Sequence, residues 1–207
     1  MRLFGAFFLQ KRWCETIIKR QLKVVVVQRD HRGFDGLDNE LANAMLHSDG
    51  FLSQFNVMTA DLAQVSTKQQ LALMNSAEIV VAHHGAGMIG SLFVNEGTVV
   101  IQILPSHMCS WSQMEFSLLP MYSGALPLTH CVPDRLVHVA GEGEEKRREA
   151  AAHEFEDSML GTDFQPYLYF VQSVQLTALQ LRMMLQQARL AMISRCLAPL
   201  ANISNSG

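Results

Sequence analysis

The chain has 207 residues, of which 49% are hydrophobic and only 17% are charged, and its formal net charge is −3. This composition excludes a disordered chain, which would combine low hydrophobicity with high charge. The slight acidity argues against a nucleic-acid-binding domain, which is normally basic. No apolar run approaches the roughly 20 residues of a membrane span. The length fits one domain with a small appendage. From the charge and the apolar runs we expect neither a nucleic-acid partner nor a membrane-spanning segment.

The four cysteines, Cys14, Cys109, Cys131 and Cys196, are widely separated and form no C-x-x-C motif. The spacing therefore supports neither a zinc site nor a thioredoxin-like redox site, and we expect no metal. It leaves open whether all four thiols are reduced or two of them form a disulfide.

Short apolar segments alternate with helical patterns along the first half of the chain. Val24–Val27 is an unbroken β-branched run, which is typical of a strand buried on both faces of a parallel sheet. Ser66 is a suitable N-cap for a helix that continues to Met74. The expected elements, in chain order, are a helix over 3–22, a strand at Lys23–Gln28, a helix at Asn39–His47, a strand at Phe51–Met58, the helix after Ser66, a strand at Ala77–Ala82, a short helix ending at Phe93, and a strand at Thr98–Leu104.

This alternation predicts an α/β fold, a Rossmann-like parallel sheet flanked by helices. Ligands of such sheets bind at the carboxyl ends of the strands, and two loops, 28–36 and 83–90, are expected there. The mixed-charge run Gly141–Asp157 is interpreted as a solvated segment. Residues Leu176–Leu197 form a helical pattern with apolar residues every seven positions, including Met183 and Leu190. We expect this helix to pack on its own domain; a second interpretation is that it also docks on a neighbouring domain.

The second loop contains a glycine motif, Gly85-Ala86-Gly87-Met88-Ile89-Gly90, which matches G-x-G-x-x-G after a strand and before a helix. Glycines allow the backbone to approach phosphate oxygens, and a helix N-terminus attracts anions. A nicotinamide-dependent oxidoreductase is one interpretation, but it needs an acidic residue at the end of the next strand, where this chain has Gln102. The esterase interpretation lacks a G-x-S-x-G nucleophile motif. His83 and His84 are adjacent on a strand, point to opposite faces, and so cannot easily share a metal ion.

The block Ala77–Pro105 resembles glycosyltransferase family 61. The similar residues run from Glu78 to Met88 (E-I-V-V-A-H-H-G-A-G-M) and continue through Leu92-Phe93, Gly97 and Val100–Pro105 (V-I-Q-I-L-P). The resemblance extends more weakly over residues 20–130. In one position the chain departs from the family pattern, because Gln102 stands where the family has Glu.

The resemblance implies an inverting glycosyltransferase of the two-domain GT-B type, and this chain is similar to its C-terminal, donor-binding half. The donor would be a UDP-sugar, the acceptor a hydroxyl of a glycan or glycoprotein, and no metal or other cofactor would be needed. The general base would lie in a separate first domain, so no catalytic residue is assigned in this chain. By resemblance the compartment would be the Golgi or the endoplasmic reticulum lumen. The residues expected to bind the donor are Arg29, Arg32, His84, Gly85, Ala86, Gly87, Met88 and Gln102.

The same resemblance implies a division of the chain into four segments. Residues 1–22 would be a linker helix from the first domain, 23–140 the donor-binding domain, 141–163 a charged loop, and 164–207 a strand and helix that complete or cap the domain. A further alternative is an inactive fragment that serves only as a nucleotide-binding or interaction module.

Overall fold

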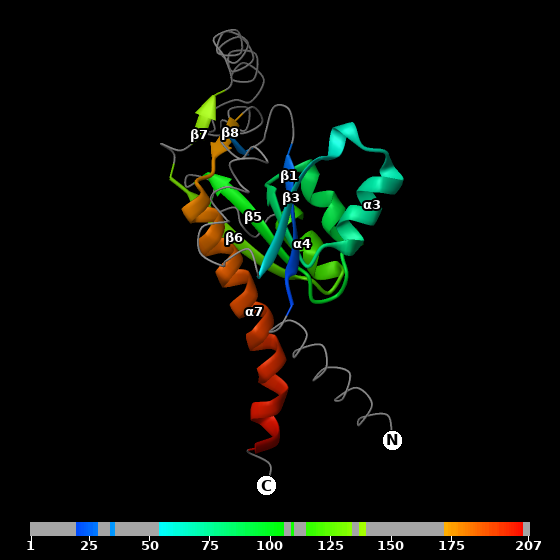
Figure 1. The fold of residues 1–207 in the computed structure, drawn as a ribbon, viewed down its shortest axis with the longest axis vertical. Coiled ribbons are helices and arrows are strands. Elements are labelled where there is room, and N and C mark those ends of the chain that lie inside the picture. The colour runs from blue at the N-terminus through cyan, green and yellow to red at the C-terminus, as the bar shows by residue number, and fades with distance from the viewer. Residues whose placement is uncertain are drawn as a thin grey trace, which may run out of the picture.

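The computed structural model describes residues 20–28, 34–35, 54–105, 109, 115–133, 137–139 and 172–204. Within these residues, five parallel strands form one sheet in the order β3-β1-β4-β5-β6 (Figure 1). The fold is therefore α/β and Rossmann-like, as the sequence predicts. The strands are β1 (Leu22–Gln28), β3 (Phe55–Asp61), β4 (Ile79–His83), β5 (Val99–Pro105) and β6 (Leu126–Val132).

The valine run of β1 explains why this strand lies inside the sheet. Val24 and Val26 belong to one hydrophobic cluster, while Val25 and Val27 belong to another. Successive side chains of a strand point to opposite faces, so an unbroken apolar run requires cover on both sides. β1 pairs with β3 on one side and β4 on the other, which confirms the expected buried strand.

Helices supply this cover on both faces of the sheet (Figure 1). The long helix α7 (Ala178–Ser204) lies on one face and buries Leu181, Leu185 and Met192 against it. The other face is covered by α3 (Thr67–Ser76), the 3₁₀ helix η4 (Ala86–Phe93) and α4 (Glu115–Tyr122). These elements contribute Met74, Met88 and Leu119 to the second cluster.

The start of α3 agrees with the prediction from sequence. Ser66 is its N-cap, and a capping box joins the Ser66 and Gln69 side chains to each other's backbone N–H groups. Such a box satisfies N–H groups that the first turn of a helix leaves without a partner. The helix continues to Ser76, two residues beyond the expected end. A single 3₁₀ turn, η3 (Leu62–Gln64), joins β3 to this helix.

α7 packs on the sheet of its own domain, as expected, but two residues of its seven-residue pattern lie outside the face that makes this contact. Met183 and Leu190 are 49% and 62% exposed, and the buried stripe is instead formed by the α7 residues of the first cluster. A straight α-helix has 3.6 residues per turn, so a strict seven-residue repeat drifts around the helix and does not by itself identify the face that packs.

The sequence did not predict α4, β6 or a three-stranded sheet in the order β2-β8-β7, although β8 falls within 164–207, where a strand was expected. The small sheet consists of β2 (Phe34–Asp35), β8 (Gln172–Gln175) and β7 (Val137–Val139), and Phe34 and Val174 join the α7-side cluster. Most of the expected helix over 3–22 lies outside the described residues, and its last residue, Leu22, is instead the first residue of β1, where it pairs with β3. The expected helix at Asn39–His47 and the charged segment 141–163 also lie outside the described residues. In the described part of the chain, no helix has the length and hydrophobicity needed to cross a membrane.

The strand order identifies where a ligand of this sheet is expected. From β1 the chain moves to β3 on one side, and from β4 it proceeds through β5 to β6 on the other. The connections therefore reverse direction between β1 and β4. Open α/β sheets bind ligands outside the carboxyl ends of the two strands at such a switch point. These ends are followed by the loop after Gln28 and by the loop that begins at His84.

Candidate functional site

The loop after β4 has a backbone conformation that depends on glycine. Gly85 has φ 126° and ψ −160°, a combination essentially restricted to glycine, and it is buried. Its carbonyl oxygen accepts a hydrogen bond of 2.8 Å from the N–H of Met88, which closes the first turn of η4. Ala86 and Gly87 are the first two residues of this helix. The glycine motif thus changes the chain from a buried strand to a helix within three residues.

His84 and Gln102 are brought together at the carboxyl end of β4. The Nδ1 atom of His84 lies 2.5 Å from the Nε2 atom of Gln102, and the side chains are buried, with 6% and 2% of each residue exposed. The backbone N–H of His84 donates to the carbonyl oxygen of Ile103, at 3.0 Å. Because β4 and β5 pair in register through Ala82 and Gln102, this contact is fixed by the sheet.

His83 lies on the opposite side of the sheet from Gln102. It pairs in register with Ile103, whose side chain belongs to the cluster on the α7 side. Its Nδ1 atom lies 3.0 Å from the carbonyl oxygen of His84. His83 and His84 therefore face different sides, as the strand alternation predicts, and among the described residues no group of three or more metal-ligating side chains is present.

Met88 has a packing role in the structure. Met88 is 1% exposed and belongs to the hydrophobic cluster beneath η4, together with Val25 and Val80. The helix begins at Ala86 and ends at Phe93, where the sequence predicts its end. Gly87 is half-buried, and the side chain of Met88 supports the loop from below.

The end of β1 is joined to the start of β2 through Gln28. The Gln28 side-chain amide accepts a hydrogen bond of 2.8 Å from the Phe34 N–H and donates one of 3.3 Å to the Phe34 carbonyl oxygen. Arg29 and Arg32, which the resemblance assigns to donor binding, lie outside the described residues.

A disulfide joins Cys109 to Cys131 near the carboxyl ends of β5 and β6. Cys131 pairs in register with Leu104, one residue before the end of β5. The sequence left this pairing open, because spacing alone cannot select among cysteines. Cys196, on α7, is also disulfide-bonded. Among the described residues, no cysteine is a free thiol.

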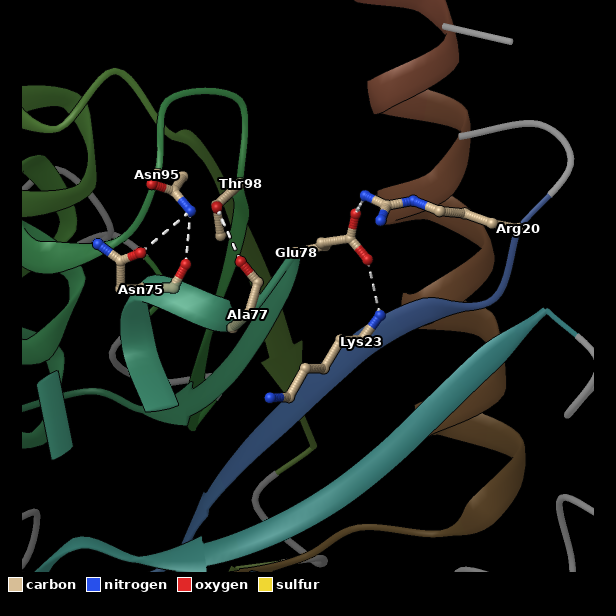
Figure 2. A network of polar contacts seen from close by, with 7 residues as sticks. All are labelled: Arg20, Lys23, Asn75, Ala77, Glu78, Asn95 and Thr98. Carbon is tan, nitrogen blue, oxygen red and sulfur yellow. Dashed lines mark hydrogen bonds and ion pairs between the residues drawn. The ribbon is translucent and has the colours of Figure 1, made fainter. Parts of the chain in front are cut away.

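A separate network of polar contacts lies at the amino ends of the strands, opposite to the end that carries the glycine loop (Figure 2). The Glu78 carboxylate accepts a hydrogen bond of 2.9 Å from the backbone N–H of Lys23 and forms an ion pair with Arg20. Asn95 donates to the carbonyl oxygen of Asn75 at 2.5 Å. The residues border a cavity of about 400 Å³ at the amino ends of β1, β4 and β5.

These contacts have a structural role. Each joins two segments at or shortly before the starts of neighbouring strands, and Thr98 likewise donates to the carbonyl oxygen of Ala77 at 3.1 Å. The polar side chains at this end therefore bind one another. The cavity lies at the amino ends of the strands, whereas the switch point lies at their carboxyl ends. The candidate site is accordingly the loop at the carboxyl end of β4.

The residues at this site do not favour a nicotinamide-dependent oxidoreductase. Such a domain uses an acidic side chain at the end of the next strand to hold the ribose hydroxyl groups. Here that strand carries Gln102, which is buried and contacts His84. Sequence reasoning selected both residues but missed the contact between them, since it depends on the register of β4 and β5.

The protein-family model described as Glycosyltransferase 61 matches residues 4–101 of the chain. This region includes β1, the loop after it, β4 and the glycine loop from His84 to Gly87. It ends one residue before Gln102. No curated protein matches the chain.

Proposed function

We propose that this chain is the donor-binding part of a glycosyltransferase that uses a UDP-sugar, because residues 4–101 match the model of glycosyltransferase family 61. The observation that carries the proposal is the position of the His84–Gly87 loop. It follows β4 at the switch point of the sheet, where open α/β folds bind nucleotides. It also lies within the family-matched region. The loop combines a backbone that needs glycine with a buried imidazole beside it.

The proposed site holds the diphosphate of the donor. Backbone N–H groups at the start of η4 and a ring N–H of His84 donate hydrogen bonds to phosphate oxygens. Arg29 and Arg32, which follow β1 in the sequence, provide permanent positive charge and forked contacts for the same oxygens. Met88 supports the loop, and Gln102 positions His84. These groups stabilise the negative charge that develops on the leaving UDP without a metal or another cofactor.

The proposed reaction transfers the sugar with inversion at its anomeric carbon. A hydroxyl oxygen of a glycan or glycoprotein forms a bond to this carbon, while the bond from the carbon to the phosphate oxygen breaks and its electron pair leaves with UDP. A general base takes the proton of the hydroxyl. We assign this base to a first domain of a GT-B arrangement, for which residues 1–22 would form the linker, 23–140 the donor-binding domain, 141–163 a charged loop and 164–207 the capping strand and helix.

The disulfides support a location in the secretory pathway. Disulfides persist in oxidising compartments and are rare in the cytosol. Cys109 is bonded to Cys131, and Cys196 is also disulfide-bonded. We therefore propose the lumen of the Golgi or the endoplasmic reticulum, where glycoprotein acceptors are present.

The test is a calorimetric titration of UDP into the purified chain, with GDP and CMP as comparison nucleotides. The Gly87→Trp variant places a large ring at the start of η4 and should abolish UDP binding. Ser76→Trp places the same ring on an exposed residue at the amino ends of the strands and should leave binding unchanged. If the folded chain and both variants all fail to bind UDP, the donor site is wrong. UDP binding without sugar transfer would support the nucleotide-binding module in place of the active enzyme.

A further inference from the structure

The contact between His84 and Gln102 determines which ring nitrogen of His84 carries a proton. The atoms 2.5 Å apart are Nδ1 of His84 and Nε2 of Gln102. An amide nitrogen donates hydrogen bonds and does not accept them. Nδ1 must then accept, and it can do so only as the unprotonated nitrogen of a neutral imidazole. The proton of the ring is therefore on Nε2.

The Nδ1 atom of His83 contacts an acceptor, whereas that of His84 contacts a donor. The Nδ1 atom of His83 lies 3.0 Å from the carbonyl oxygen of His84. A carbonyl oxygen only accepts, so Nδ1 of His83 must carry a proton. The two adjacent histidines thus differ in the nitrogen that donates, because one ring contacts a donor and the other contacts an acceptor.

We infer that Gln102 is a positioning residue that holds His84 as the neutral tautomer protonated at Nε2, and thereby presents an N–H donor at the start of the glycine loop. The ligand of this donor rests on the proposed function, in which Nε2–H donates to a diphosphate oxygen of the UDP-sugar. The side chains of both residues are buried, and Gln102 is fixed by its register with Ala82. The ring can therefore turn little without losing the contact.

A carboxylate at position 102 would have a different effect. It can only accept, so it would bind a proton on Nδ1 and would also favour the doubly protonated ring. The other titratable side chain on β4 is His83, which lies on the opposite face, and β5 and η4 contain none. The amide at this position is therefore the group on these three elements that decides the protonation of His84.

The test is nitrogen-15 NMR of the histidine rings in the full chain, with the His84 signals assigned by their loss in His84→Gln. At neutral pH we expect His84 to show the pattern of a neutral ring protonated at Nε2, and His83 that of a ring protonated at Nδ1. In Gln102→Glu, the proton of His84 should move to Nδ1, or both nitrogens should be protonated, and the midpoint of its titration should rise. In Gln102→Met, which has similar volume and no donor, His84 should show a mixture of tautomers. A proton on Nδ1 of His84 in the unchanged chain would overturn the inference.

UDP titration separates this inference from the proposed function. Loss of one positioning hydrogen bond should weaken UDP binding about 2- to 12-fold in Gln102→Met. A chain that binds UDP but has the Nδ1-protonated ring would refute the inference and leave the donor site standing. A chain with the Nε2-protonated ring that does not bind UDP would refute the donor site alone. Equal UDP affinity in Gln102→Met and the unchanged chain would show that the contact does not position His84 for the nucleotide.

Discussion

Replacing Gly85 by Ala should lower the free energy of unfolding by about 1–3 kcal/mol, the usual cost of a backbone conformation that a side chain disfavours. Gly85 has φ 126° and ψ −160°, where a Cβ collides with its own backbone. The position cannot relax easily, because β4 ends only two residues before it and the Met88 N–H binds its carbonyl oxygen at 2.8 Å. The loop must therefore either keep the strain or give up the first turn of η4.

Gly87→Ala is the matched control for this change. In the described part of the chain, the glycines with positive φ are Gly85, Gly97 and Gly124, so Gly87 has an ordinary backbone conformation. Alanine at such a position commonly stabilises a protein by about 0.4–1 kcal/mol, since it restricts the unfolded chain. The two substitutions add the same methyl group two residues apart, and they should change stability in opposite directions.

Urea unfolding followed by circular dichroism measures the difference. With an unchanged slope m, the transition midpoint should fall for Gly85→Ala and stay or rise for Gly87→Ala. Equal midpoints for the two variants would contradict the argument from the backbone angles. A lower midpoint for Gly87→Ala than for Gly85→Ala would show that side-chain space, and not φ, limits the loop.

Three further changes test other parts of the structure. Glu78→Ala removes the charged acceptor of the Lys23 N–H and should cost about 1.5–3 kcal/mol in urea unfolding; no loss would show that water replaces the carboxylate. Burial lowers the pKa of His130 in the folded chain, so the unfolded chain binds more protons below pH 6.5, and stability should fall as pH decreases from there. His130→Gln should reduce the dependence of the unfolding free energy on pH in this range. An unchanged dependence would contradict the lowered pKa of His130. Replacing Cys109 and Cys131 together by Ala opens a loop of 22 residues and should cost about 3 kcal/mol by loop entropy; a transition as stable as that of the unchanged chain would refute this estimate.

The central part of the fold could be predicted because its residues have one strong structural preference each. The valines of β1 need cover on both faces, and Ser66 with Gln69 marks the start of α3. The strands expected at Ala77–Ala82 and Thr98–Leu104 are each found shifted by one or two residues. Such boundaries depend on pairing with neighbouring strands, which local sequence does not contain.

The elements that were missed have weaker local signals. β6 reads Leu-Pro-Leu-Thr-His-Cys-Val, and its proline and polar residues give only a weak strand signal, as is typical of an edge strand. The contact between Gln102 and His84 depends on the register of two strands, so the sequence indicated the residues but not their relation. Likewise the disulfide at Cys131 depends on where β6 lies beside β5.

The position of β6 also affects how the protein behaves at high concentration. Among the described strands, β6 pairs only with β5, so it forms an edge of the sheet. Edge strands offer N–H and C=O groups to which a strand of another molecule can add, and this is a common start of aggregation. Pro127 has no N–H and has a fixed φ, which makes it a poor partner for an added strand. The proline that obscures β6 in the sequence therefore protects the folded molecule from intermolecular sheet formation along this edge.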